Sequence, residues 1–265
     1  MSTNPLDPSG AHRIHSPHRG GDRGSDASNR EYYDDFATRY EDERGGRRPG
    51  GYHDLIDDLE VAIVRRYATG KDLLEVGCGT GLLLTRFAEF TRSARGVDLS
   101  PGMLEHARQR GLDVTEASAT DLPFPDASFD VTCSFKVLAH VPDIHKALAE
   151  MTRVVRPGGY VLAEFYNRFS MRALVKRYGP AGRVSDSRKE DAVYTRFDSP
   201  EEVVAMLPPN VRLVGSRGVR ILTPSAGALR VPVLGKLLVR AEHALSDSPL
   251  RNFGGFWVAI LQKQV

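Results

Sequence analysis

The chain has 265 residues, of which 41% are hydrophobic and 26% charged, and its formal net charge is +2. This length suits one large domain or one domain with insertions, and no apolar run approaches the ~20 residues of a membrane span. The 2 cysteines cannot build a disulfide framework or a three-cysteine iron–sulfur cluster. Because residues 1–29 also lack the apolar segment of a secretory signal, we expect a cytoplasmic protein.

Charge is divided unevenly along the chain. Residues 1–167 hold 20 Lys and Arg against 26 Asp and Glu, whereas residues 168–265 hold 16 against 8. Such asymmetry fits an acidic partner for the second part, and it equally fits free variation of surface charge.

The N-terminal segment is too polar to bury a core. Residues 1–29 are rich in Gly, Ser, Pro, Asp and His, so we predict a disordered tail followed by a domain over residues 30–265. Aromatic residues at helical spacing then predict a short helix over residues 29–43. Its aromatic face either packs on the domain or closes over a ligand, and Tyr33 and Tyr40 are the candidates for the second role.

A glycine-rich turn follows the first predicted strand. An apolar run from Lys71 ends in Gly77, Gly79 and Gly81, and a helical pattern comes next. Turns of this kind let the backbone approach a ligand closely. A dinucleotide-binding turn would have another glycine at position 82, where this chain has Leu82, so the spacing argues against a pyrophosphate ligand.

An acidic residue ends the second predicted strand, over residues 95–99. The carboxylate of Asp98 can accept two hydrogen bonds from a ribose diol. Ser100 is a good helix cap, and Pro101 suits the first helical position.

Strands and helices alternate from residue 71 to residue 165. Strands are predicted over residues 113–117 and 129–134, then an amphipathic helix over residues 143–156 that Pro157 ends, then a fifth strand. This alternation predicts a parallel sheet with right-handed crossovers. A helix over 200–207 and an antiparallel edge pair of strands, over 211–221 and 253–262, complete the domain.

Two segments are predicted insertions that cover the substrate. Residues 168–196 carry 8 basic and 3 acidic side chains and follow the fifth strand, whose C-terminal end faces the ligand crevice of such folds. Residues 222–250 include an amphipathic helix over 233–245 with a basic face. That helix either covers the sheet or the substrate pocket, or rests on an anionic membrane.

Four ordered motifs together resemble a known family. They read LEVGCGTG, GVDLSPGMLEHAR, SATDLPFPDASFD, and HVPD followed by RVVRPGGYVL. The chain resembles the class I S-adenosylmethionine-dependent methyltransferases, in the type 11 branch that includes the ubiquinone and menaquinone methyltransferases. The resemblance implies an α/β, Rossmann-like fold with a central seven-stranded, mostly parallel sheet, helices on both faces and an antiparallel last strand.

The same resemblance implies S-adenosylmethionine as the cofactor and a role for each matching residue. The implied contacts are Glu75, Gly77, Cys78, Gly79 and Gly81 for the methionine part, Asp98 for the ribose, Leu99, Met103, Ala119, Thr120 and Asp121 for the adenine, Phe135 near the sulfonium, and Tyr33 and Tyr40 for the lid.

The reaction implied is in-line methyl transfer to a small molecule, with acidic, lipid-like and carrier-bound acceptors all open. His140 follows the fourth strand and is the candidate general base, although a histidine there can instead order the loop. Tyr166 and Arg168, at the end of the fifth strand, are candidates for substrate contact. No metal-ligand spacing stands out.

Other functions stay open at this point. A nicotinamide-dependent reductase on a related fold and a non-catalytic cofactor-binding scaffold are the alternatives. Nucleic-acid modification is disfavoured because the segment after the fourth strand reads SFKV, without a motif for a flipped base. The sequence leaves the methyl acceptor, the methylated atom (O, N or C) and the oligomeric state undetermined.

Overall fold

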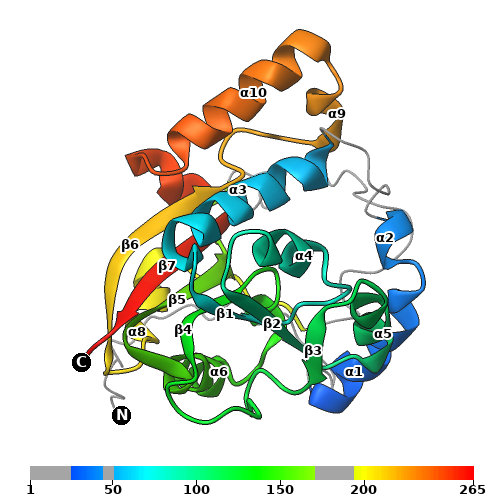
Figure 1. The fold of residues 1–265 in the computed structure, drawn as a ribbon. Helices are drawn as coiled ribbons and strands as arrows, with labels where there is room; N and C mark the ends of the chain where they lie inside the picture. The colour runs from blue at the N-terminus through cyan, green and yellow to red at the C-terminus, as the bar shows by residue number, and fades with distance from the viewer. Residues whose placement is uncertain (1–24, 44–50, 171–193) are drawn as a thin grey trace, which may run out of the picture.

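A seven-stranded mixed sheet organises the chain (Figure 1). The computed structural model describes residues 25–43, 51–170 and 194–265. The helices are α1 (Asp26–Ala37), α2 (Tyr40–Glu43), α3 (Tyr52–Ala68), α4 (Leu82–Ala88), α5 (Pro101–Gln109), α6 (Ile144–Arg153), α8 (Pro200–Ala205), α9 (Ala226–Leu229) and α10 (Pro232–Leu245), with 3-10 turns η1 (Leu138–His140) and η2 (Pro249–Phe253). The strands are β1 (Asp72–Val76), β2 (Ser93–Asp98), β3 (Asp113–Glu116), β4 (Phe129–Ser134), β5 (Val155–Tyr166), β6 (Val211–Val219) and β7 (Phe256–Lys263).

The strand order is β3-β2-β1-β4-β5-β7-β6. Strands β1 to β5 pair in parallel, and β7 pairs antiparallel with both β5 and β6. This confirms the predicted Rossmann-like sheet with its antiparallel last strand. The order reverses between β1 and β4, and in doubly wound sheets a ligand crevice forms at such a point, outside the carboxyl ends of the strands.

Helices cover both faces of the sheet. Helices α3, α4 and α5 contribute to one apolar cluster, and α6 and α8 contribute to the other. Leu73 and Leu74 on β1 point to opposite faces, and both have no exposed surface. Burial of consecutive residues explains why β1 reads as a continuous apolar run rather than an alternating one.

Some predicted boundaries are wrong. The helix predicted over 143–156 ends at Arg153, because Val155 already pairs with Phe129 as the first residue of β5, so Pro157 does not end the helix. The helix predicted over 29–43 is two helices. The first starts earlier, at Asp26, where the Ser25 side chain caps it by accepting a hydrogen bond from the Ser28 amide at 3.2 Å.

Parts of two predictions fall outside the described residues. These are the disordered tail up to residue 24 and, within the predicted substrate cover over 168–196, residues 171–193. The division into a tail, a domain over 30–265 and two covers therefore stays a prediction.

Candidate functional site

The turn after β1 presents its backbone to a cavity. Gly77, Gly79 and Gly81 all have positive φ, between 54° and 81°, which glycine adopts at little cost. A Cβ built on Gly77 would lie 2.2 Å from a methyl group of Val137, so only glycine fits there. A Cβ on Gly79 would have no atom within 4 Å, so this position faces open space that a ligand can fill.

The predicted acid at the tip of β2 is joined to this turn. One oxygen of Asp98 accepts a hydrogen bond from the Gly79 amide at 2.8 Å, and the other accepts one from the Ser100 amide at 3.0 Å. Burial raises the pKa of Asp98, while these amide donors oppose the rise. A carboxylate has about four acceptor sites, so capacity remains for ligand hydroxyls.

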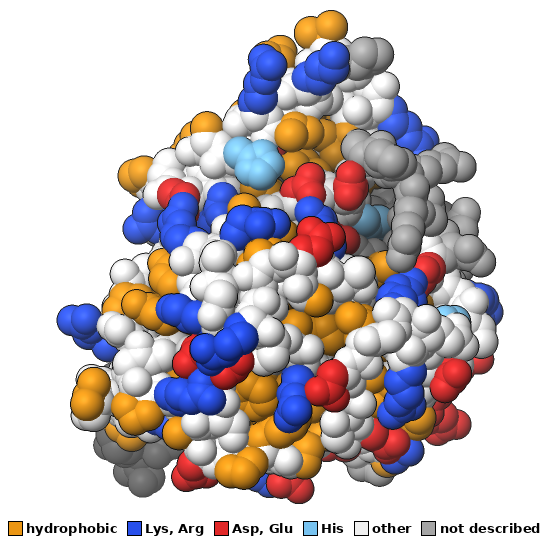
Figure 2. All heavy atoms as spheres, viewed as in Figure 1, with side chains coloured by type: hydrophobic (Ala, Val, Ile, Leu, Met, Phe, Trp, Pro, Cys, Tyr) orange, Lys and Arg blue, Asp and Glu red, His pale blue; other side chains and the backbone are white. Residues whose placement is uncertain are grey.

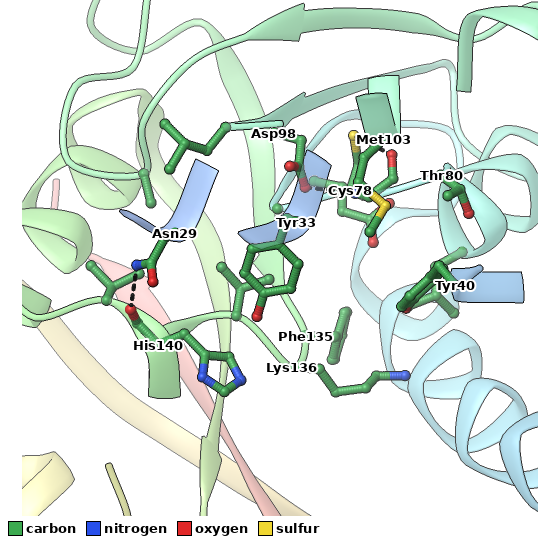
Figure 3. A pocket seen from close by; sticks show the side chains of 18 of the residues that line it. Asn29, Tyr33, Tyr40, Cys78, Thr80, Asp98, Met103, Phe135, Lys136 and His140 are labelled. Carbon is green, nitrogen blue, oxygen red and sulfur yellow. Dashed lines mark hydrogen bonds between the residues drawn. The ribbon is translucent and has the colours of Figure 1, made fainter. Parts of the chain in front are cut away.

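A cavity of about 420 Å³ opens beside Asp98 and the glycine turn (Figure 3). It lies at the carboxyl ends of β1, β2 and β4, where the strand order reverses. It brings together thirteen of the residues predicted from the sequence. They are Tyr33, Tyr40, Glu75, Gly77, Cys78, Gly79, Asp98, Leu99, Met103, Ala119, Phe135, His140 and Tyr166.

Four predicted site residues lie outside this lining. Gly81 packs against α5 and the residues after it, since a Cβ there would lie 3.2 Å from that of Ala107 and 2.3 Å from Leu112. The Thr120 amide donates to the Ser118 hydroxyl, and the Asp121 amide donates to the Ser118 carbonyl oxygen. Both residues therefore lie in a turn, where the Asp121 side chain is exposed. The fourth residue, Arg168, follows β5 and points to α8 instead of the cavity, because it forms an ion pair with Glu202 at 3.0 Å.

Helix α1 closes one side of the cavity by docking on the start of α5. Asp34 accepts hydrogen bonds from the Gly102 amide at 2.9 Å and from the Ser100 hydroxyl. A Cβ on Gly102 would lie 3.3 Å from that of Ala37, so a glycine at this position lets the two helices approach closely. This docking brings Tyr33 into the lining.

The imidazole of His140 is fixed in one tautomer. Its Nδ1 lies 2.9 Å from the carbonyl oxygen of Tyr194, which can only accept, so Nδ1 carries the proton and Nε2 is the acceptor. Burial lowers the pKa of His140, which favours the neutral ring. The Asn29 amide donates to the His140 carbonyl at 3.1 Å, and the ring borders the cavity (Figure 3).

Buried carboxyl groups surround Lys136, which lines the cavity together with Glu75. Lys136 pairs with Glu60 at 2.9 Å and Asp57 at 3.1 Å, and its amide donates to Glu164 at 3.0 Å. Burial, followed by the charge of Glu60, raises the pKa values of Glu75 and Glu164 well above the ordinary range. Among the described residues, Oε2 of Glu75 has no hydrogen-bond partner although it is buried and Glu75 lines the cavity.

Several lining residues were not predicted from the sequence. Phe36 shares the helical spacing of the predicted lid tyrosines, so that spacing could have identified it. Asn29 and His53 come from helices outside the motifs and offered no such signal. The full set missed is Asp26, Asn29, Phe36, His53, Thr80, Leu82, Leu83, Ala117, Ser118, Lys136, Val137 and Val141.

Comparisons with known proteins agree with this geometry. The methyltransferase domain family matches residues 74–163. The ubiquinone biosynthesis O-methyltransferase of Nitrosococcus oceani is 30% identical over 180 residues, which are 64% of this chain and 75% of that protein. The chain belongs to the S-adenosylmethionine-dependent methyltransferases.

Other relatives match a shorter stretch. A protein of Mycolicibacterium smegmatis named probable S-adenosylmethionine-dependent methyltransferase is 37% identical over 103 residues, or 38% of this chain and 40% of that protein. The chain thus spans about two fifths of that relative. A solved methyltransferase of Thermotoga maritima, described as a possible histamine N-methyltransferase, has a TM-score of 0.63 and 23% identity over 89% of this chain and 99% of its own, which supports the fold alone.

The residues present fit the family's cofactor, S-adenosylmethionine. The open space at Gly79 leaves room for the amino-acid part, and the buried, unpaired oxygen of Glu75 suits an ammonium group. Asp98 offers the acceptor that a ribose diol needs. In the described residues no helix is both long and apolar enough to cross a membrane.

Proposed function

We propose that this methyltransferase transfers a methyl group from S-adenosylmethionine to a small-molecule acceptor by in-line displacement. One observation carries the proposal: the Asp98–Gly79 pair and the neutral His140 border the same cavity of about 420 Å³. A cofactor grip and a proton acceptor in one hollow are what a transfer to a protonated acceptor requires.

The cofactor side of the cavity is assigned to the turn after β1 and the tip of β2. In this proposal Asp98 accepts hydrogen bonds from the ribose hydroxyls, and Leu99 and Met103 pack on the adenine. Glu75 accepts from the ammonium group, whose positive charge would lower the raised pKa of that carboxyl. When bound, the cofactor supplies a methyl carbon activated by positive sulfur.

The acceptor side is assigned to His140 and the aromatic residues beside it. The His140 ring lies 5.6 Å from that of Tyr166 and 6.4 Å from that of Tyr33, measured between centroids. Nε2 of His140 would take the proton that the acceptor loses as its bond to the methyl carbon forms and the bond from the methyl carbon to sulfur breaks. The aromatic rings hold the acceptor in line and exclude water, and such positioning supplies up to about 7–11 kcal/mol.

The acceptor is proposed to be a hydroxyl or amine on a partly apolar molecule. A neutral histidine takes a proton from such groups, and aromatic side chains favour an apolar body next to them. Arg168 is not included in the acceptor site, because it pairs with Glu202 outside the cavity.

The alternatives predict different binding. A nicotinamide-dependent reductase is disfavoured by the family and by Leu82, which lines the cavity where the third glycine of a dinucleotide turn would be. A non-catalytic scaffold would bind the cofactor without transferring its methyl group.

A two-part experiment separates these functions. Calorimetry with S-adenosylhomocysteine and with NADH tests the cofactor, and we expect heat with the first only. The purified chain is then incubated with a metabolite extract and S-adenosylmethionine that carries a labelled methyl group. The His140→Ala variant gives the background level of label. Label in a small molecule above that background supports methyl transfer, whereas S-adenosylhomocysteine binding without label in any product supports the scaffold.

A further inference from the structure

Helix α10 turns an apolar face to solvent. Val233, Leu234 and Leu237 are 73%, 44% and 56% exposed, and positions three and four apart lie on one side of a helix. The opposite side is buried and includes Gly235 and Glu242. This orientation is the reverse of that expected for a helix that covers a core.

Buried contacts fix this orientation. Glu242 has no exposed surface, and its carboxylate accepts hydrogen bonds from the amides of Ile221, Leu222 and Thr223 at 2.7–2.8 Å, just after β6. A Cβ on Gly235 would lie 2.3 Å from the Leu229 carbonyl oxygen, so α9 packs closely there. Rotating α10 to bury Leu234 and Leu237 would turn Glu242 to solvent and leave the buried amides of Ile221 and Thr223 without an acceptor, which is costly.

The exposed charges of α9, α10 and the turn between them are all positive. Arg230, Lys236 and Arg240 are exposed, and the one acidic residue between positions 226 and 245 is the buried Glu242. Hydrophobic side chains gather with Lys and Arg at the top of the molecule, over α9 and α10 (Figures 1 and 2). An apolar face flanked by cations is typical of helices that lie in a membrane interface.

We propose that α10 docks on a surface of anionic lipid, with its apolar face among the acyl chains and its cations at the lipid phosphates. At 14 residues the helix is about 21 Å long, too short to span a bilayer but sufficient to lie in its surface plane. A second copy of the chain is a poorer occupant, because a two-fold pairing of this face would bring like charges together.

The cavity lining draws none of its described residues from 222–250. Docking through α10 would therefore leave the methyl-transfer site accessible, and this inference stands independently of the proposed function. The substrate-covering role predicted for this segment stays a prediction.

Vesicle flotation tests the inference with the full chain. The probes are vesicles of phosphatidylcholine alone and of phosphatidylcholine with phosphatidylglycerol in equal parts. We expect binding to the second kind and its loss as salt rises. Leu237→Glu should lower the partition coefficient roughly tenfold or more. Reversing Lys236 and Arg240 to Glu should lower it roughly twenty-five-fold or more, because each cation near an anionic surface contributes about fivefold.

The matched control is Val204→Glu. Val204 is 48% exposed on α8, so it tests an added charge at an exposed apolar position away from α10, and its partition coefficient should equal that of the wild type. S-adenosylhomocysteine affinity and thermal unfolding, measured for every variant, show whether each is folded. Absence of binding to anionic vesicles, or equal binding by folded Leu237→Glu, overturns the inference. A dimer that Leu237→Glu dissociates, without vesicle binding, would identify a second copy as the occupant.

Discussion

Replacing Asp98 by Asn should weaken cofactor binding about a hundredfold. The Asp98 carboxylate accepts hydrogen bonds from the Gly79 and Ser100 amides at 2.8 and 3.0 Å. In our proposal it also accepts from two ribose hydroxyls. Asparagine keeps the size but has one acceptor oxygen and no charge. Since a hydrogen bond to a charged group contributes about 1.5–3 kcal/mol, losing one or two of them costs roughly 3 kcal/mol, or two orders of magnitude in Kd.

The control is Asp121→Asn. Asp121 is the other acid that the motifs predicted, but it is exposed and lies outside the cavity lining. We expect its affinity to change by less than about threefold, as for an ordinary surface substitution. Calorimetry with S-adenosylhomocysteine measures both variants, and thermal unfolding verifies that they are folded. Our assignment is refuted if Asp98→Asn binds as the wild type does, or if Asp121→Asn loses as much affinity as Asp98→Asn.

Three further predictions test the base, the turn and the lid. Burial lowers the pKa of His140 below its ordinary 6.5, so the base stays neutral to a lower pH than a free imidazole and kcat/KM should fall only below that ordinary value. His140→Gln should reduce kcat roughly 10²-fold or more and remove this acid limb. Gly77→Ala should lower the thermal unfolding temperature most, because its Cβ would meet Val137 at 2.2 Å. Gly79→Ala should lower it less, through the strain of its positive φ alone, and should lower cofactor affinity because its Cβ enters the open space. Asp34→Ala removes two hydrogen bonds to the start of α5, each contributing about 1.5–3 kcal/mol because the acceptor is a carboxylate. This variant should increase proteolysis within α1 and raise the cofactor Kd, and unchanged cleavage would count against the docking of α1.

The cofactor half of the site could be predicted because it is local in sequence. The glycine turn, Asp98 and Met103 lie within thirty residues of one another, and each has a conformational or chemical reason for its residue type. The alternation of strands and helices likewise predicted the parallel sheet that β1 to β5 form. Boundaries were harder: at Val155 the pairing with β4 determines where the strand begins, and the sequence pattern alone favoured a longer helix.

The acceptor half could not be predicted in the same way, because contacts distant in sequence build it. The Asn29 amide reaches the His140 carbonyl across 111 positions, and the Tyr194 carbonyl reaches the imidazole across 54. No local pattern around Lys136 predicted that Asp57 and Glu60 on α3 and Glu164 on β5 would surround it. In each case tertiary packing, rather than a local pattern, selects the partner.

Helix α1 connects the two halves of the site. Through Asp34 it holds Ser100, whose amide donates to the carboxylate of Asp98, and through Asn29 it holds the backbone of His140. Ordering one helix therefore positions both the proposed ribose acceptor and the proposed base. Asn29→Ala removes only the contact of α1 with the acceptor side of the site, the hydrogen bond to the His140 carbonyl. It should therefore lower kcat while leaving S-adenosylhomocysteine affinity nearly unchanged. An equal loss in both quantities would mean that α1 acts as a single structural support and does not position the base separately.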